Sequence, residues 1–278
     1  MYRSIGVGIG GAGSWRALAW AIEEAENSGS RLVLIHVCAP GSPLEQSAGE
    51  PTPADLELID PNLARALTNA RSRLGLRRAV LKVYSGEPSS QLVGASRGVG
   101  LLVIGAGEGD RTVRRTVRQA HCPVVIVRPG AEWSSVGVNH VVAGVDGSTA
   151  GRMALEFAFA YADQHRLPLA AVHVMEARGD HAAQEGSGTE AGRKLLTEEL
   201  QPWVSKYPAV MTKTKVFMAS VVDGLVRAGH GSPLLVVGDK RRGVIGRIRT
   251  GDVPVIVAME GPCPVAVVPI EQREGEPL

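Results

Sequence analysis

An acidic residue and hydroxyl residues stand directly behind an apolar run in the second half of the chain. The run His140–Val145 is followed by Asp146, Gly147, Ser148 and Thr149. A carboxylate at the end of a buried strand can accept hydrogen bonds from a ribose hydroxyl or an adenine amine. The same carboxylate can instead cap the helix that follows, and Ser148 or Thr149 would serve equally well as caps. The sequence leaves both interpretations of Asp146 open.

Histidine and cysteine are the other residues that could do chemistry, and each occurs at repeated positions. His36 and His173 lie near the ends of apolar runs, where a histidine is more typical of a satisfied core residue than of an acid or base. Cys122 and Cys263 each precede a proline with no base nearby in sequence, which favours packing over nucleophilic chemistry. No spacing of Cys and His is typical of a metal site.

The segment Gly8–Gly13 reads Gly-Ile-Gly-Gly-Ala-Gly and fits the glycine-rich turn of dinucleotide-binding proteins. Such proteins carry an acidic residue about 20 positions later, at the end of the second strand. Here His36, Val37 and Cys38 stand at that point. A dinucleotide enzyme is therefore disfavoured.

The elements that must position these residues are apolar, strand-like runs that alternate with helix-length amphipathic segments. This alternation is typical of a parallel sheet covered by helices. The predicted strands are Ser4–Ile9, Arg31–Cys38, Ala79–Tyr84, Leu101–Gly105 and Pro123–Arg128, then His140–Val145, Leu169–Met175, Lys213–Met218, Leu234–Gly238 and Pro264–Pro269. We predict an α/β fold with two tandem Rossmann-like sheets, each of five parallel strands with helices on both faces.

The two halves repeat one another at the level of single residues. His36-Val matches His173-Val, Leu-Leu-Val-Ile-Gly105 matches Leu-Leu-Val-Val-Gly238, and Cys122-Pro-Val matches Cys263-Pro-Val. The last match shows that the second copy has eight more residues between its fourth and fifth strands. We predict one domain over residues 1–130 and a second over 137–271, with a short linker after Pro129.

Composition limits the class of protein. Hydrophobic residues make up 44% and aromatic residues 4% of the 278, which suits small aliphatic cores. Thirty Lys and Arg against 28 Asp and Glu leave a net charge of +2, so nucleic acid is an unlikely partner. The three cysteines imply no disulfide framework, and no apolar stretch reaches membrane-spanning length. We expect a cytoplasmic protein with no membrane association.

Three motifs together make the chain resemble the universal stress protein family. They are Val145-Asp146-Gly-Ser148 leading into a helix, His173-Val174 near the end of the second strand, and Cys263-Pro-Val opening the last strand. The resemblance covers both copies nearly end to end. It implies a fold like that of adenine nucleotide alpha hydrolases, with ATP or another adenine nucleotide as the possible ligand.

Nucleotide-binding members of that family carry Gly, two residues, Gly, nine residues and Gly-Ser after the fourth strand. The matching positions here are Gly238, Arg241, Gly251 and Asp252. Asp252 would repel phosphate and Arg241 would fill space that glycine leaves open. Asp252 can instead cap a helix that begins near Pro254 while Arg241 pairs with it. The alternative is a modified nucleotide site in which Arg241 contacts phosphate.

The resemblance implies a candidate nucleotide-binding set in the second copy. The set is Val145, Asp146, Ser148, Val174, Val237, Gly238, Arg241, Gly251, Asp252 and Val253.

The first copy departs further from the family, because Gly10 stands where the second has Asp146 and the segment after Gly105 is too short for a phosphate loop. We expect no ATP there. The four arginines 111, 114, 115 and 118 with Val113 and Val117 favour a solvated face opposite a buried stripe, and a site for an acidic partner is the alternative.

The function that follows is a tandem universal stress protein with a regulatory role and at most weak or modified adenine-nucleotide binding in domain 2. The alternatives are an ATP-binding stress protein and a nucleotide-free interaction protein. We expect no enzyme and no metal, with weak ATPase activity as the alternative. The last strands of the two copies are expected to pair within the chain as a pseudo-dimer, and the whole chain to form a homodimer.

Overall fold

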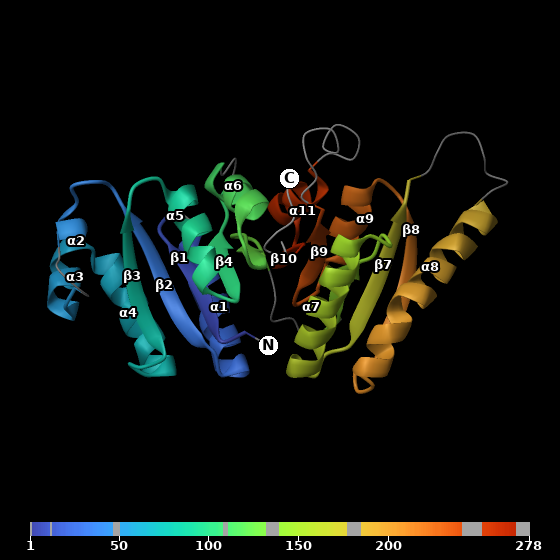
Figure 1. The fold of residues 1–278 in the computed structure, drawn as a ribbon, viewed down its shortest axis with the longest axis horizontal. Helices are drawn as coiled ribbons and strands as arrows, with labels where there is room; N and C mark the ends of the chain where they lie inside the picture. The colour runs from blue at the N-terminus through green and yellow to red at the C-terminus, as the bar shows by residue number, and fades with distance from the viewer. Residues whose placement is uncertain are drawn as a thin grey trace, which may run out of the picture. The chain divides into compact units, whose positions relative to one another are not determined.

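The two halves of the chain form separate units, each with its own parallel sheet. The computed structural model describes residues 2–11, 13–46, 51–107, 111–131, 139–176, 185–240 and 252–270. The first unit comprises Met1–Pro129 and the second Gly130–Leu278 (Figure 1).

The sheet of the first unit has the strand order β3-β2-β1-β4-β5, and all its pairs are parallel. Its strands are β1 (Ser4–Ile9), β2 (Arg31–Cys38), β3 (Ala79–Ser85), β4 (Leu101–Gly105) and β5 (Val124–Val127). Its helices are α1 (Ser14–Ser28), α2 (Pro43–Gln46), α3 (Pro53–Ile59), α4 (Pro61–Leu74), α5 (Pro88–Ala95) and α6 (Arg111–Gln119), with a 3-10 turn at Ser96–Gly98.

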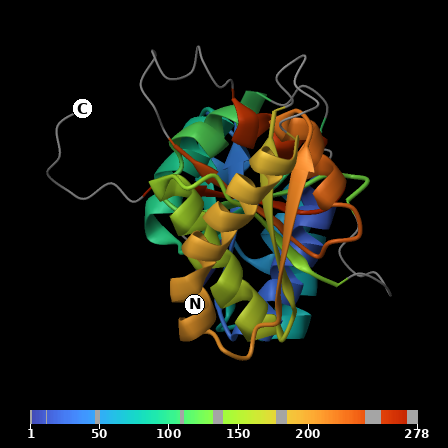
Figure 2. The same ribbon diagram turned by 90° about the vertical axis from the view of Figure 1, so that its right-hand side faces the viewer.

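The second unit repeats this topology with the order β10-β9-β6-β7-β8, again parallel throughout. Its strands are β6 (Val141–Gly144), β7 (Leu169–Met175), β8 (Thr212–Met218), β9 (Leu235–Asp239) and β10 (Val265–Pro269). Its described helices are α7 (Thr149–His165), α8 (Glu185–Lys206), α9 (Val221–Ala228) and α11 (Val253–Glu260). Figure 2 views this unit with α8 and β8 toward the reader.

All ten predicted strands are present, and none differs from its predicted bounds by more than one residue at either end. The predicted fold class is therefore confirmed. In each sheet the first strand is central, and the chain runs from it first to one side and then to the other. Because parallel crossovers are right-handed, this reversal places α1 and α4 on one face of the first sheet and α5 and α6 on the other.

The strands are continuous apolar runs because helices cover both faces of each sheet. In the first unit Ile5, Leu34 and Ile126 are fully buried. In the second unit the largest fully buried side chain is Phe159 of α7, which stacks on Trp203 and Tyr207. The core is thus aliphatic in the sheets, and its aromatic residues lie in the helices, with Trp20 of α1 in the first unit and the Phe159 stack in the second.

In both units the first helix begins in contact with the end of the fourth strand. A Cβ atom built on Gly105 would lie 2.3 Å from the carbonyl carbon and oxygen of Gly13, which precedes α1. A Cβ atom built on Gly238 would lie 2.2 Å from the carbonyl oxygen of Ala150 in α7. Backbone therefore meets backbone at both places, and only glycine fits the strand.

We expect Gly105→Ala to destabilise the protein, because the added methyl group has to displace backbone rather than a flexible side chain. The free energy of unfolding should fall by about 1–3 kcal/mol. Urea denaturation followed by circular dichroism measures it. Gly107→Ala is the matched control, since a Cβ atom there meets nothing within 4 Å. Equal denaturation midpoints for the two variants would contradict this account of the contact.

Candidate functional site

The strand ends of the second unit bring several of the predicted site residues together. Strand β6 lies between β7 and β9, so their carboxyl ends share one edge of the sheet. Val145 and Asp146 follow β6, Val174 lies near the end of β7, and Val237 and Gly238 lie near the end of β9. This is the edge at which ligands bind in open parallel sheets.

Asp146 is the centre of a small polar cluster at this edge. Its Oδ2 lies 2.5 Å from the ammonium nitrogen of Lys240, which follows β9. Its Oδ1 accepts hydrogen bonds from the Ser148 hydroxyl at 2.6 Å and the Ser148 backbone N–H at 3.0 Å. The side chains of Asp146 and Lys240 remain 45% and 33% exposed. Both oxygens of the carboxylate therefore have a partner, yet the group is still reachable from solvent.

Ser148, rather than Asp146, caps helix α7. Its hydroxyl accepts a hydrogen bond from the backbone N–H of Gly151 at 3.1 Å, and it has the extended backbone typical of an N-cap. Asp146 does not cap the helix itself. It accepts hydrogen bonds from Ser148 and thereby orients the serine that does. A Cβ atom on Gly151 would lie 2.6 Å from Oδ1 of Asp146, so the carboxylate occupies the space that this glycine leaves.

Opposing effects act on the pKa of Asp146, and their net result is a lowered value. Partial burial raises the pKa, while hydrogen bonds from Lys240 and Ser148 and the positive charge of Lys240 lower it. The lowering prevails, so Asp146 stays ionised to a lower pH than an ordinary aspartate.

Gly238 has a packing role that does not depend on a ligand. Its contact with Ala150 of α7 excludes any side chain, and Gly105 has the same contact in the first unit, where the phosphate loop is missing. A glycine at this position is therefore needed by the fold in both copies. Its presence carries no information about phosphate.

Asp252 and Val253 mark the start of helix α11. Asp252 stands at the N-cap position, which one of the two interpretations of the sequence requires, and Pro254 falls in the first turn. The Asp252 side chain makes no capping hydrogen bond to the helix. Arg241 and Gly251 lie outside the described residues, so the predicted pair between Arg241 and Asp252 stays a prediction.

Three of the four valines of the candidate set, Val145, Val174 and Val237, lie at the strand ends. Val145 and Val237 are each 4% exposed. Val174 faces helix α9, since a Cβ atom on Gly224 of that helix would lie 2.7 Å from its methyl groups. The neighbouring His173 points to the opposite face, and its Nδ1 lies 2.7 Å from the carbonyl oxygen of Val145.

Lys240 is the site residue that sequence reasoning missed. It follows β9 directly and lies beside Arg241 in the sequence, while its partner Asp146 is almost a hundred residues earlier. The available signal was the topology, because strands β6 and β9 are neighbours and end at the same edge. A cation that follows β9 is thus within reach of a carboxylate that follows β6.

The first unit has no carboxylate at the position of Asp146, where Gly10 stands, but it keeps the histidine contact. Nδ1 of His36 lies 3.2 Å from the carbonyl oxygen of Ile9, as His173 does with Val145. The two histidines therefore hold the end of the first strand in both units. This shared geometry fits the structural role predicted for both histidines.

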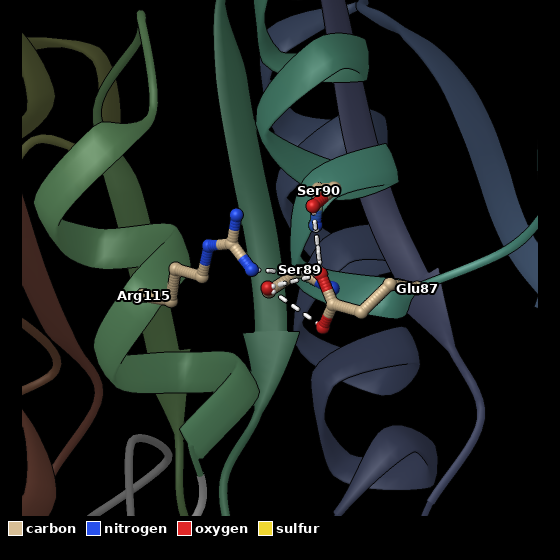
Figure 3. A network of polar contacts seen from close by, with 4 residues as sticks. All are labelled: Glu87, Ser89, Ser90 and Arg115. Carbon is tan, nitrogen blue, oxygen red and sulfur yellow. Dashed lines mark hydrogen bonds and ion pairs between the residues drawn. The ribbon is translucent and has the colours of Figure 1, made fainter.

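The basic helix α6 of the first unit is tied to α5 through Glu87 (Figure 3). Glu87 is the N-cap of α5 and accepts hydrogen bonds from the hydroxyl groups of Ser89 and Ser90, each at 2.8 Å. A guanidinium nitrogen of Arg115 lies 3.2 Å from its Oε2. Val113 and Val117 are buried beneath this face, as predicted.

Hydrogen bonds from Ser89 and Ser90 lower the pKa of Glu87 to about 2. The carboxylate is therefore ionised across the physiological range and remains a fixed partner for Arg115. One arginine of the basic helix is thus engaged with its own chain. This contact fits the interpretation of α6 as a solvated face.

The cysteines offer no reactive thiol. All three are buried, and burial raises the pKa of Cys263 to about 12. Among the described residues no group of three or more His, Cys, Asp or Glu is arranged to hold a metal ion. In the same part of the chain no helix is long and apolar enough to span a membrane.

Comparison with known proteins relates the repeated unit to a family. A model of the universal stress protein family matches residues 1–128 and again residues 137–269. A universal stress protein of Mycolicibacterium smegmatis is 29% identical over 274 residues, which cover 91% of this chain and 92% of that protein. One from Mycobacterium tuberculosis is 28% identical over 278 residues, covering 90% and 91%.

Solved structures agree on the fold. The crystal structure of a universal stress protein from Archaeoglobus fulgidus aligns with a TM-score of 0.66 over 96% of each chain, at 13% identity. The family model matches the chain twice, and the relatives align over about 90% of both chains. The chain belongs to the universal stress protein family and carries two of its domains in tandem.

Proposed function

We propose that this chain is a regulatory stress-response protein of the cytoplasm whose second domain binds adenine nucleotides only weakly or in a modified way. The observation that carries the proposal is the ion pair between Asp146 and Lys240. A ribose hydroxyl that used Asp146 would have to compete with Lys240 and with Ser148 for the same two oxygens. Asp252 would add like-charge repulsion to the phosphates.

A specific observation also supports the alternative of a modified ATP site. Lys240 places a cation at the edge of the sheet where phosphates would arrive, and Arg241 follows it in the sequence. Lys or Arg can replace glycine backbone as a phosphate contact. In that case Lys240 would exchange Asp146 for a phosphate oxygen when ATP binds.

We propose no catalytic step for this protein. The polar groups that surround Asp146 among the described residues are the carboxylate itself, the capping Ser148 and Lys240. None of them is a free general base beside a nucleophile, which hydrolysis would require. A nucleotide-free interaction protein, acting through its surfaces, remains the second candidate function.

Replacing Lys240 by Met should raise the pKa of Asp146, because the variant keeps the partial burial and loses the hydrogen bond and the charge that oppose it. A group with a lowered pKa stabilises the folded state at higher pH, and this contribution is lost as the pH falls through its folded pKa. The loss should therefore begin at a higher pH in the variant. Titration of the Asp146 carboxyl carbon by NMR measures the shift.

The control for this experiment is Lys206→Met, which removes a lysine of the same unit that is paired with Glu156 at 3.2 Å. It should leave the titration of Asp146 unchanged. An Asp146 pKa that is the same in wild type and in Lys240→Met would mean that the ion pair is absent in solution.

Arg241→Gly combined with Asp252→Ser should tighten ATP binding, because the pair of changes restores the family's phosphate-loop residues. Each unfavourable contact removed is worth about 1–3 kcal/mol, so the affinity should rise by roughly tenfold to a hundredfold. Each single change should help less, since it leaves the former partner's charge unpaired. Calorimetric titration with ATP, ADP and cyclic AMP measures the three affinities.

Two results would replace this proposal with the modified ATP site. One is low-micromolar ATP binding by the unaltered chain, and the other is weaker binding after Arg241→Gly. Arg241 would then be a phosphate ligand rather than an obstacle.

We also propose that the last strands, β5 and β10, pair within the chain and that the chain forms a homodimer. An unpaired apolar edge would invite aggregation, and internal pairing removes two such edges. Amide hydrogen exchange should then be slow for every residue of 124–127 and 265–268. Fast exchange at alternate residues would contradict the pairing, and sedimentation as one species near 29.2 kDa would contradict the homodimer.

A further inference from the structure

The first unit contains a pocket of about 200 Å³ that the nucleotide site does not use. It lies between the carboxyl ends of β1 and β2 and the first turns of α1 and α4. Its side chains include Trp15, Leu18, His36, Asp60, Asn62 and Leu63. The space corresponds to about six or seven water molecules, enough for a small organic group.

This pocket lies on the opposite face of the sheet from Val37, the residue that matches the candidate nucleotide residue Val174. His36 lines it together with residues of α1 and α4. Successive side chains of a strand point to opposite faces, so Val37 faces α5. Val37 matches Val174, the candidate nucleotide residue of the second unit, which faces α9. The pocket is therefore distinct from any nucleotide site that the first unit might retain.

The polar lining includes the acceptors Asp60 and His36 beside the amide of Asn62 and the hydroxyl of Ser14. Oδ1 of Asp60 caps α4 by accepting from the backbone N–H groups of Asn62 and Leu63 at 3.1 and 3.0 Å. Its Oδ2 has no partner within the described part of the chain. His36 uses Nδ1 toward the carbonyl of Ile9, which in a neutral ring leaves Nε2 as an acceptor. No Lys or Arg is among the described residues that line the pocket.

Trp15 adds an aromatic wall to this set of acceptors. It is 49% exposed, although tryptophan is a residue that folding normally covers. An indole ring attracts an organic cation through its electron-rich face. A carboxylate, an imidazole and an indole thus surround one space, and the carboxylate and the indole face favour a ligand that is cationic and donates hydrogen bonds.

The second unit fills the equivalent position with a cation of its own. The shared contact of the first helix with the fourth strand aligns Gly13 with Ala150, and therefore Trp15 with Arg152. The guanidinium of Arg152 donates two hydrogen bonds to Glu199 of α8, at 2.9 and 2.8 Å. Glu199 is only 14% exposed. In the first unit tryptophan replaces this internal cation, and the pocket's carboxylate comes from a different place, the N-cap residue Asp60 of α4.

We infer that this pocket binds a small organic cation, an ammonium or guanidinium group on an apolar stem. The stem lies against Trp15 and Leu18 while the charged group donates to Asp60 and His36. The cation is supplied either by a free small amine or by a Lys or Arg side chain of a peptide. The inference concerns the first unit and is independent of nucleotide binding in the second.

Three probes of nearly equal shape test the charge preference: 2-phenylethylammonium, 2-phenylethanol and phenylacetate. The full-length chain is titrated with each, and the indole N–H signal of Trp15 is followed by NMR. The chain has four tryptophans, and Trp15→Phe identifies this signal. The ammonium probe should give a saturable shift, the alcohol should bind about tenfold more weakly, and phenylacetate should not bind.

Asp60→Asn is the main variant, because asparagine keeps the cap of α4 and removes only the charge. It should weaken the ammonium probe by about tenfold and leave the alcohol unchanged. Trp15→Leu should weaken the ammonium probe by roughly threefold more than it weakens the alcohol. Glu57→Gln, an exposed neutralisation on α3 outside the pocket, is the matched control and should bind like wild type.

The source of the cation is distinguished by a capped tripeptide with a central lysine and its norleucine counterpart. Preferential binding of the lysine peptide over the free ammonium probe assigns the pocket to a protein side chain, and the reverse assigns it to a small amine. Equal binding of 2-phenylethylammonium and phenylacetate by wild type would overturn the inference. So would an Asp60→Asn variant that binds the ammonium probe like wild type, or an absence of binding by every cationic probe.

Discussion

The contact between the first helix and the end of the fourth strand determines where every candidate site of this protein lies. In each unit a strand glycine, Gly105 or Gly238, meets the backbone at the start of that helix with no room for a side chain. The start of the first helix therefore lies against the carboxyl end of the fourth strand. The loop that joins the first strand to the helix is held at the edge where ligands bind in parallel sheets.

From this common position the two copies have diverged in the side chains that surround the loop. The second unit places charged pairs on both sides, with Lys240 on Asp146 and Glu199 on Arg152. The first unit has Gly10 in place of Asp146 and Trp15 in place of Arg152. One copy thus satisfies its charges internally, whereas the other exposes an aromatic ring and an open carboxylate.

The bonds that Asp146 already makes to Lys240 and Ser148 affect how a ligand could bind to the second unit. A carboxylate with two strong donors gains little from a ribose hydroxyl, since binding exchanges one hydrogen bond for another. Affinity would then depend on the phosphates, where Lys240 attracts and Asp252 repels. Whether a nucleotide binds would therefore depend on how its phosphates compete with the charged side chains of the protein for the same partners.

The sequence by itself determined the strands, the duplication and the family, because continuous apolar runs and repeated motifs are local signals. It also identified Asp146, Ser148 and Asp252 as residues at element ends. It could not identify Lys240 as the partner of Asp146, or bring Trp15 and Asp60 to one pocket.

These pairings join residues tens of positions apart, and only the order of strands and the packing of α1 against α4 make them neighbours. The tertiary structure also changed the meaning of Gly238, from a glycine that would leave room for phosphate to one that the backbone of α7 requires. The sequence motif shows only that position 238 is a glycine. The packing of α7 against β9 explains why a glycine is needed there.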